Sequence, residues 1–160
     1  MKENKAQPAV VDIYTDGACL GNPGPGGYAA ILRWGDLEKE IVDGLAQTTN
    51  NRMELMAVLA GLKALKYPCR VRIHTDSQYI SRAINEGWID KWKKNGWQTA
   101  QKAGVKNKDL WEELIRLMEI HKVQFVWIRG HSGHKYNERC DSLARKAALE
   151  VSGKPKKGKV

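Results

Sequence analysis

The chain has 160 residues, the size of one ordinary domain, because two domains of half that length would each bury too small a core. Its 42% hydrophobic and 28% charged residues exclude disordered and fibrous classes, and no apolar run approaches the roughly 20 residues needed to cross a bilayer. The net charge of +9 lies in residues 91–108 and 152–160, which hold six and four lysines and no acid, and it favours a polyanionic partner such as a nucleic acid.

The first part of the chain is predicted to form a three-stranded antiparallel meander. Residues 10–16 alternate in the way that is typical of a strand. Residues 17–27 contain five glycines and two prolines, which predict a loop. Two further strands, residues 28–34 and 38–45, flank a turn at Gly35-Asp36.

The next part is predicted to be a helix, a strand and a second helix. Apolar residues follow the helical period from Asn51 until Tyr67-Pro68 ends it. Residues 70–76 alternate as a fourth strand, and a helix follows over residues 77–85. A right-handed crossover would place the fourth strand parallel to the first.

Residues 87–106 lack periodicity and combine lysines with three of the six tryptophans, so we expect a protrusion there. A helix over residues 110–121 and a fifth strand over residues 123–129 follow. A glycine loop, residues 130–134, and a helix over residues 137–151 complete the domain. The predicted fold class is α/β, with a five-stranded mixed sheet flanked by helices.

Two of these strands end in the same pattern. Ile13-Tyr14-Thr15-Asp16-Gly17 and Ile73-His74-Thr75-Asp76-Ser77 share an apolar residue, an aromatic ring, a threonine, an aspartate and a small residue. Parallel neighbours would bring both aspartates to the carboxyl edge of the sheet, where Mg²⁺ or Mn²⁺ is the cation that oxygen ligands favour. The alternative is that each aspartate merely opens a turn.

Two further acids have structural alternatives. Asn51 and Glu54 have the spacing of a capping box, and acids favour a first helical turn. Asp141, near the start of the last helix, has the same alternative. His131 and His134 lie in the glycine loop, where proton transfer is a more natural role than zinc binding with Cys140, because no second thiolate or HExxH spacing is present.

The cysteines and the N-terminal residues indicate the compartment. Cys19, Cys69 and Cys140 are odd in number and lack CxxC spacing, so we expect free thiols in a reducing environment. Residues 1–8 lack the apolar core of a signal peptide, which predicts a cytoplasmic protein.

Five motifs together closely resemble those of bacterial type 1 ribonuclease H, in that family's order and over residues 10–151. The motifs are residues 14–27 (YTDGACLGNPGPGG), 48–55 (TTNNRMEL), 75–79 (TDSQY), 130–134 (GHSGH) and 137–141 (NERCD). The resemblance implies a ribonuclease H-like fold and an endonuclease that cuts the RNA strand of RNA–DNA hybrids.

The resemblance also implies the roles of individual residues. Four carboxylates, Asp16, Glu54, Asp76 and Asp141, would hold two Mg²⁺ ions, with Mn²⁺ as a substitute. One ion would activate the attacking water and the other would stabilise the departing 3′ oxygen, leaving a 5′ phosphate. His131 matches the family's loop histidine, which is thought to help protonation or product release.

Substrate contacts follow from the same resemblance. The expected contacts near the scissile phosphate or the DNA strand are Cys19 (through its backbone), Asn22, Thr49, Asn50, Asn51 and Gln78. Helix capping and a turn before Pro23 are the structural alternatives for the asparagines. Residues 88–108 resemble the family's basic protrusion, in which we expect Trp88, Trp92, Lys93 and Lys94 to contact the hybrid and Trp97 to anchor the loop.

The predicted organisation is an N-terminal extension (residues 1–9), a catalytic domain (residues 10–151) and a basic tail (residues 152–160) that we expect to be disordered and solubilising. We expect a monomer. Two alternatives stay open: a transposase- or integrase-type nuclease acting on DNA, and a hybrid-binding module without catalysis. The asparagine and histidine motifs argue against the first, and the presence of all four acids argues against the second.

Overall fold

The fold is a five-stranded mixed sheet, seen in a computed structural model that describes residues 10–99, 104–129 and 134–153. The strand order is β4-β3-β2-β5-β6. An antiparallel meander is formed by β2 (Val10–Cys19), β3 (Gly24–Trp34) and β4 (Leu37–Thr48). Two strands, β5 (Arg70–Thr75) and β6 (Lys122–Trp127), add to it in parallel. The predicted α/β fold class and five-stranded sheet are confirmed.

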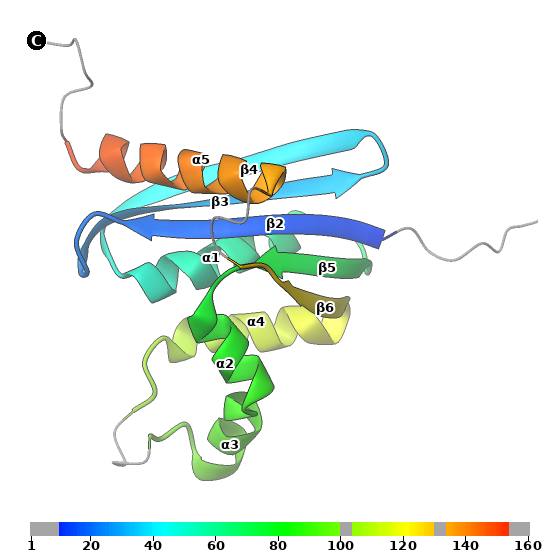
Figure 1. Cartoon of the computed structure of the whole chain (residues 1–160). Coiled ribbons are helices and arrows are strands. Elements are labelled where there is room, and N and C mark those ends of the chain that lie inside the picture. Colours follow the sequence, from blue (N-terminus) through cyan, green and yellow to red (C-terminus); the bar gives the residue numbers. More distant parts are fainter. Residues whose placement is uncertain (1–9, 100–103, 130–133, 154–160) are drawn as a thin grey trace, which may run out of the picture.

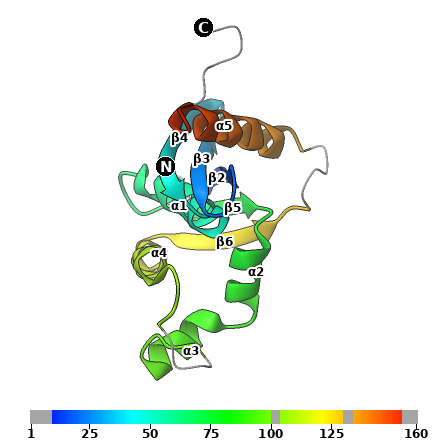
Figure 2. The same cartoon turned by 90° about the vertical axis from the view of Figure 1, so that its left-hand side faces the viewer.

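Helices cover both faces of the sheet (Figure 1). One face carries α5 (Lys135–Val151), and the other carries α1 (Asn50–Lys63) and α4 (Lys108–Ile120). Strand alternation produces two cores, because Ile13 and Ala30 face α1 whereas Tyr14 and Ala29 face α5. In both views α3 (Trp88–Asn95) projects away from the sheet beyond α2 (Gln78–Asn85), as expected of the protrusion (Figure 2).

The glycine-rich segment differs from the prediction of a loop over residues 17–27. β2 continues to Cys19 and β3 begins at Gly24, with Gly17 opposite Tyr28 and Cys19 opposite Gly26, so only residues 20–23 form the connection. Gly27 in this segment allows close packing of the strand against a helix. A Cβ added at Gly27 would lie 2.2 Å from the carbonyl oxygen of Ala144, because α5 lies directly on the strand at this point.

Other helix and strand boundaries differ from the predicted ones by a few residues. α1 ends at Lys63, before the Tyr67-Pro68 stop, and α5 begins at Lys135. α3 forms within the segment that lacks periodicity, because a two-turn helix with no fully buried residue needs no apolar stripe. Among the described residues, no helix is both long and apolar enough to span a membrane. The N-terminal extension, residues 1–9, and most of the basic tail lie outside the described residues.

We predict that Gly27→Ala lowers the free energy of unfolding by about 1–3 kcal/mol, because the added methyl meets helix backbone that cannot rotate away. Urea denaturation followed by circular dichroism measures the change. Gly104→Ala is the matched control, since a Cβ there meets nothing within 4 Å. Equal stability of the two variants would contradict the packing role of Gly27.

Candidate active site

The paired aspartates lie where the repeated pattern predicted them. β2 and β5 are parallel neighbours, with Ile13 opposite Ile73 and Tyr14 opposite His74. The rings of Tyr14 and His74 stack with their centroids 4.3 Å apart. Asp16 and Asp76 each follow two residues later, Asp16 within β2 and Asp76 directly after β5, so both lie toward the carboxyl end of β5. The register prediction is confirmed.

Glu54 reaches the same edge from α1. The N-cap of this helix is Thr49, whose side-chain oxygen accepts a hydrogen bond from the backbone N–H of Arg52 at 3.2 Å. Glu54 therefore lies in the second turn, and the capping-box interpretation is wrong. Gly17 allows the approach, because a Cβ there would lie 2.6 Å from the backbone nitrogen of Glu54.

Asp16, Glu54 and Asp76 form a tight carboxylate cluster, with one oxygen from each within 4.8 Å of the others. Asp16 and Glu54 are each only 6% exposed. Burial, together with the negative charges of Asp76 and Asp141, raises the pKa of Asp16 to about 8. Burial, with the charges of Asp16 and Asp76, raises the pKa of Glu54 well above its usual range.

The cluster fits a hard divalent cation. Among the described residues, the buried Oε1 of Glu54 has no hydrogen-bond partner, although an isolated buried carboxylate oxygen is costly. A cation between the three carboxylates would satisfy this oxygen, offset the repulsion and lower the raised pKa values. The donors are all oxygens, which suits Mg²⁺ or Mn²⁺ better than zinc.

Asp141 approaches from the opposite layer. It is the seventh residue of α5, which begins at Lys135, so the first-turn interpretation does not apply. After burial and the charge of Asp76, the charge of Asp141 is the next cause of the raised pKa of Asp16. Asp141 also accepts a hydrogen bond from Nε of Arg145 at 3.2 Å. It flanks the cluster of three without sharing its 4.8 Å spacing.

The zinc alternative gains no support from Cys140. The thiol is buried and donates to the backbone oxygen of Tyr14 at 3.2 Å, and burial raises its pKa to about 12. His134 lies beside the Tyr14 ring at 5.4 Å, and its buried Nδ1 has no partner among the described residues. His131 lies outside the described residues, so its predicted role is not tested.

The predicted substrate contacts outside the protrusion lie on or next to the elements that carry the carboxylates. The side-chain oxygen of Asn22 accepts from the backbone N–H of Asn50 at 3.2 Å, joining the β2–β3 connection to the start of α1. Cys19 lies at the end of β2, its thiol 3.6 Å from the backbone oxygen of Thr48. Asn51 is the second residue of α1 and Gln78 the first of α2, and both are exposed.

The protrusion is anchored by aromatic packing. Trp92 lies 5.4 Å from Trp97 and 5.5 Å from the fully buried Trp111, measured between ring centroids. The anchoring predicted for Trp97 thus extends to Trp92. Trp88 packs edge-on against Tyr79. Lys93 and Lys94 are exposed on α3, as a phosphate contact requires.

Sequence reasoning did not single out Arg52. Its guanidinium binds both carboxylate oxygens of Asp109 at 3.1 and 2.8 Å, which ties the start of α1 to the start of α4. Asn107 accepts a further bond from Arg52 at 3.2 Å. Arg52 lies inside the motif of residues 48–55, but partners more than 50 residues away leave no local pattern.

The carboxylates lie toward the carboxyl ends of β2 and β5. A cavity of about 710 Å³ is present at the opposite end of the sheet, lined by the strand starts and by Trp34, Tyr67 and Ile120, and no carboxylate of the cluster lines it. The cluster and this cavity are therefore separate features of the fold.

Comparisons with known proteins identify the fold and the motifs. The RNase H family model matches residues 8–149. Ribonuclease H of Oleidesulfovibrio alaskensis is 57% identical over 135 residues, 84% of this chain and 88% of that protein. Ribonuclease H of Pelobacter propionicus is 56% identical over 150 residues, covering 94% of this chain and 91% of that protein.

Two solved structures are also similar. LC9-RNase H1, a type 1 RNase H with the type 2 active-site motif, has a TM-score of 0.80 and 31% identity, covering 92% of this chain and 76% of that one. LC11-RNase H1, solved in complex with RNA/DNA hybrid, has a TM-score of 0.64 and 25% identity, covering 88% and 98%. Fold and acidic edge together define a nuclease domain. The chain belongs to the ribonuclease H family.

We predict that Asp16→Asn stabilises the metal-free protein at alkaline pH. The pKa of Asp16 rises from an ordinary 3.8 to about 8 on folding, so the folded state binds this proton more tightly, and stability falls as pH rises between these values. At pH 8.5 in EDTA, urea denaturation should show the variant more stable by at least about 1.4 kcal/mol, the equivalent of one pKa unit.

The difference should shrink at pH 4, close to the ordinary pKa of 3.8, because the folded carboxyl is still protonated there and little of the stability has been lost. At pH 8.5, Mg²⁺ should reduce the stability difference between the variant and the wild type, because it stabilises only the wild type. A variant that is less stable than the wild type at pH 8.5 would contradict the repulsive character of the cluster.

Proposed function

We propose that this chain is an endonuclease that hydrolyses the RNA strand of RNA–DNA hybrids with two Mg²⁺ ions, giving 5′-phosphate and 3′-hydroxyl ends. The observation that carries the proposal is the cluster of Asp16, Glu54 and Asp76, whose oxygens lie within 4.8 Å of one another near the carboxyl end of β5. Membership of the ribonuclease H family supports the reaction class.

The four carboxylates hold the metals in this proposal, with Asp16, Glu54 and Asp76 at the centre and Asp141 at the side. Divalent ions in such a site lower the pKa of a water molecule and offset the charge that develops on the phosphate and its departing oxygen. The cluster supplies the negative charge that binds them, and burial keeps its oxygens poorly solvated. His131 moves a proton at the leaving oxygen.

Hybrid recognition is assigned to the polar residues that surround the cluster. Asn22, Asn50 and Gln78 reach the 2′-hydroxyls that distinguish RNA from DNA in an A-like minor groove. The backbone at Cys19 and the side chain of Asn51 complete this surface. Thr49 holds a phosphate of the DNA strand. The hydrogen bond from Asn50 to Asn22 supports the assignment, because it joins two of these segments.

The protrusion is assigned to the DNA strand. Lys93 and Lys94 offer exposed charge to phosphates in the last turn of α3, and Trp88 begins the same helix. Packing among Trp92, Trp97 and Trp111 holds the helix so that these lysines face outward. Mn²⁺ as a substitute metal, a monomeric state and a cytoplasmic location stay predictions.

Asp76→Asn should bind hybrid with unchanged affinity but cut it at least about 100-fold more slowly in Mg²⁺, because the cluster loses a charge that holds the ions. A labelled hybrid, matched duplex DNA and matched duplex RNA are compared. Asp36→Asn, in the exposed β3–β4 turn, is the control. The proposal is wrong if the wild type cuts duplex DNA instead, if it cuts nothing, or if Asp76→Asn turns over normally.

Replacing Lys93 and Lys94 with glutamine should weaken hybrid binding and reduce the slope of log affinity against log salt by about 1–2, because two phosphate contacts are lost. Fluorescence anisotropy at several salt concentrations measures the slope. Lys66→Gln/Lys122→Gln removes equal charge at the opposite end of the sheet and serves as the control. An unchanged slope in the Lys93→Gln/Lys94→Gln variant would show that the protrusion is not part of the binding surface.

A further inference from the structure

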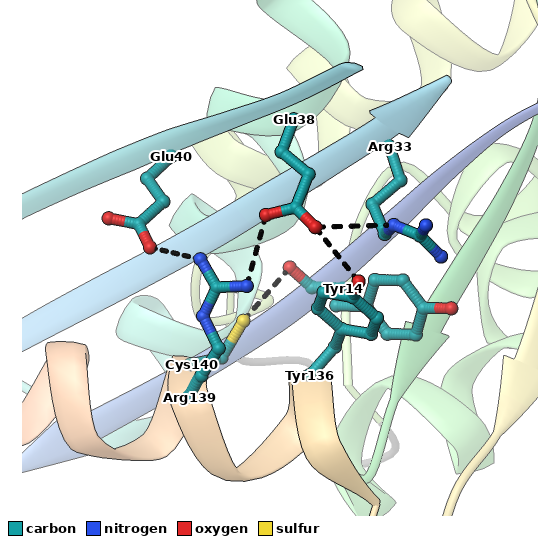
Figure 3. Close-up of polar contacts among 7 residues, drawn as sticks. All are labelled: Tyr14, Arg33, Glu38, Glu40, Tyr136, Arg139 and Cys140. Carbon is teal, nitrogen blue, oxygen red and sulfur yellow. Dashed lines mark hydrogen bonds and ion pairs between the residues drawn. The ribbon is translucent and has the colours of Figure 1, made fainter. Parts of the chain in front are cut away.

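The N-terminal half of α5 is held to the sheet by a polar clamp, which we define as Arg33, Glu38, Glu40, Tyr136 and Arg139 (Figure 3). Both carboxylate oxygens of Glu38 accept a bond from α5, one from the Tyr136 hydroxyl at 2.8 Å and one from Nη1 of Arg139 at 3.1 Å. The other terminal nitrogen of Arg139 binds Glu40. The helix is thus tied to two positions of β4.

Further contacts hold the same part of the helix. The Arg33 guanidinium lies 4.6 Å from the centre of the Tyr136 ring, and its Nε is 3.5 Å from Glu38. The Tyr136 ring also stacks on Tyr14 with centroids 4.9 Å apart. The next residue after the clamp arginine, Cys140, donates its thiol to the backbone oxygen of Tyr14. The α5 residues that make these contacts, Tyr136, Arg139 and Cys140, all lie within five residues of Asp141.

The remainder of α5 contacts the sheet differently. Ala144, Ala147 and Ala148 lie over Gly27 and its neighbouring strand position Gly44, and Leu143 also packs against this core. The alanines allow close approach but bury little area each. The clamp therefore supplies most of the directional contacts that set where α5 lies along the sheet.

The position of α5 matters because this helix carries Asp141, which lies two residues after Arg139. Of the four acids, Asp141 is also the one outside the 4.8 Å set, so its distance from the metals depends on how the helix is held.

We propose that Tyr136 and Arg139, by binding Glu38 and Glu40, are positioning residues for Asp141 and thereby set the metal affinity of the site. The inference rests on the proposed metal-dependent function. Tyr136 and Arg139 touch neither substrate nor metal; they act by fixing the register of α5. The clamp side chains are about one-third exposed, so their loss should cost little stability compared with its effect on the site.

The test compares Tyr136→Phe/Arg139→Gln with Glu113→Gln, which breaks an exposed ion pair of 3.1 Å to Lys63 between α1 and α4. Mn²⁺ affinity by titration calorimetry should fall roughly 10-fold in the clamp variant and stay unchanged in the control. At fixed, subsaturating Mg²⁺, kcat should fall while KM for hybrid stays within about twofold. Arg139→Lys, with Tyr136 kept, should restore part of the affinity, because it keeps a cation beside Glu38 and Glu40.

A double-mutant cycle separates positioning from general loosening. On an Asp141→Asn background, removal of the clamp should leave Mn²⁺ affinity unchanged, because the group that it positions is gone. An equal loss on both backgrounds, or unaltered Mn²⁺ affinity with a lowered melting temperature, overturns the inference. A wild-type chain that binds no Mn²⁺ overturns the proposed metal chemistry as well, so the two failures are distinguishable.

Discussion

The structure depends on bringing acidic side chains close together at one end of the sheet, where burial favours their uncharged forms. Asp16, Glu54 and Asp76 are brought within 4.8 Å, and burial removes the water that would screen them. These acids are held in place by the backbone pairing of β2 with β5 and by the close approach of α1 at Gly17. The Asp12 carboxylate, which binds Arg72 and His74, adds a side-chain contact between the two strands. Repulsion thus makes the site a place for cations, and ordinary packing keeps it assembled.

The sequence predicted the parts of the site that depend on local pattern. Two five-residue segments with matching side chains have one register when their strands pair in parallel, so Asp16 and Asp76 could be placed together in advance. Fold class followed from the alternation of strands and helices. Glu54 was ambiguous, because its spacing from Asn51 also fits a cap, and only the cap at Thr49 decides between the two interpretations.

The parts that could not be predicted depend on partners far apart in the chain. Gly27 was assigned to a loop, since nothing near it shows that α5, more than 100 residues later, lies on it. Trp92 was expected to face the hybrid, and its packing on Trp111 comes from a separate helix. The contacts of Arg139 with Glu38 span 101 residues in the same way. Contacts between residues so far apart leave no periodic pattern in the sequence that could predict them.

The order of the elements along the chain has a consequence for synthesis. Asp16 lies in β2, Asp76 follows β5 and Glu54 comes from α1, but Asp141 arrives on α5, the last helix in the described part of the chain and the one on the other face. A nascent chain translated only as far as α4 holds three acids without the fourth. Under the proposed function, the metal site would therefore be complete only after nearly the whole domain had emerged from the ribosome.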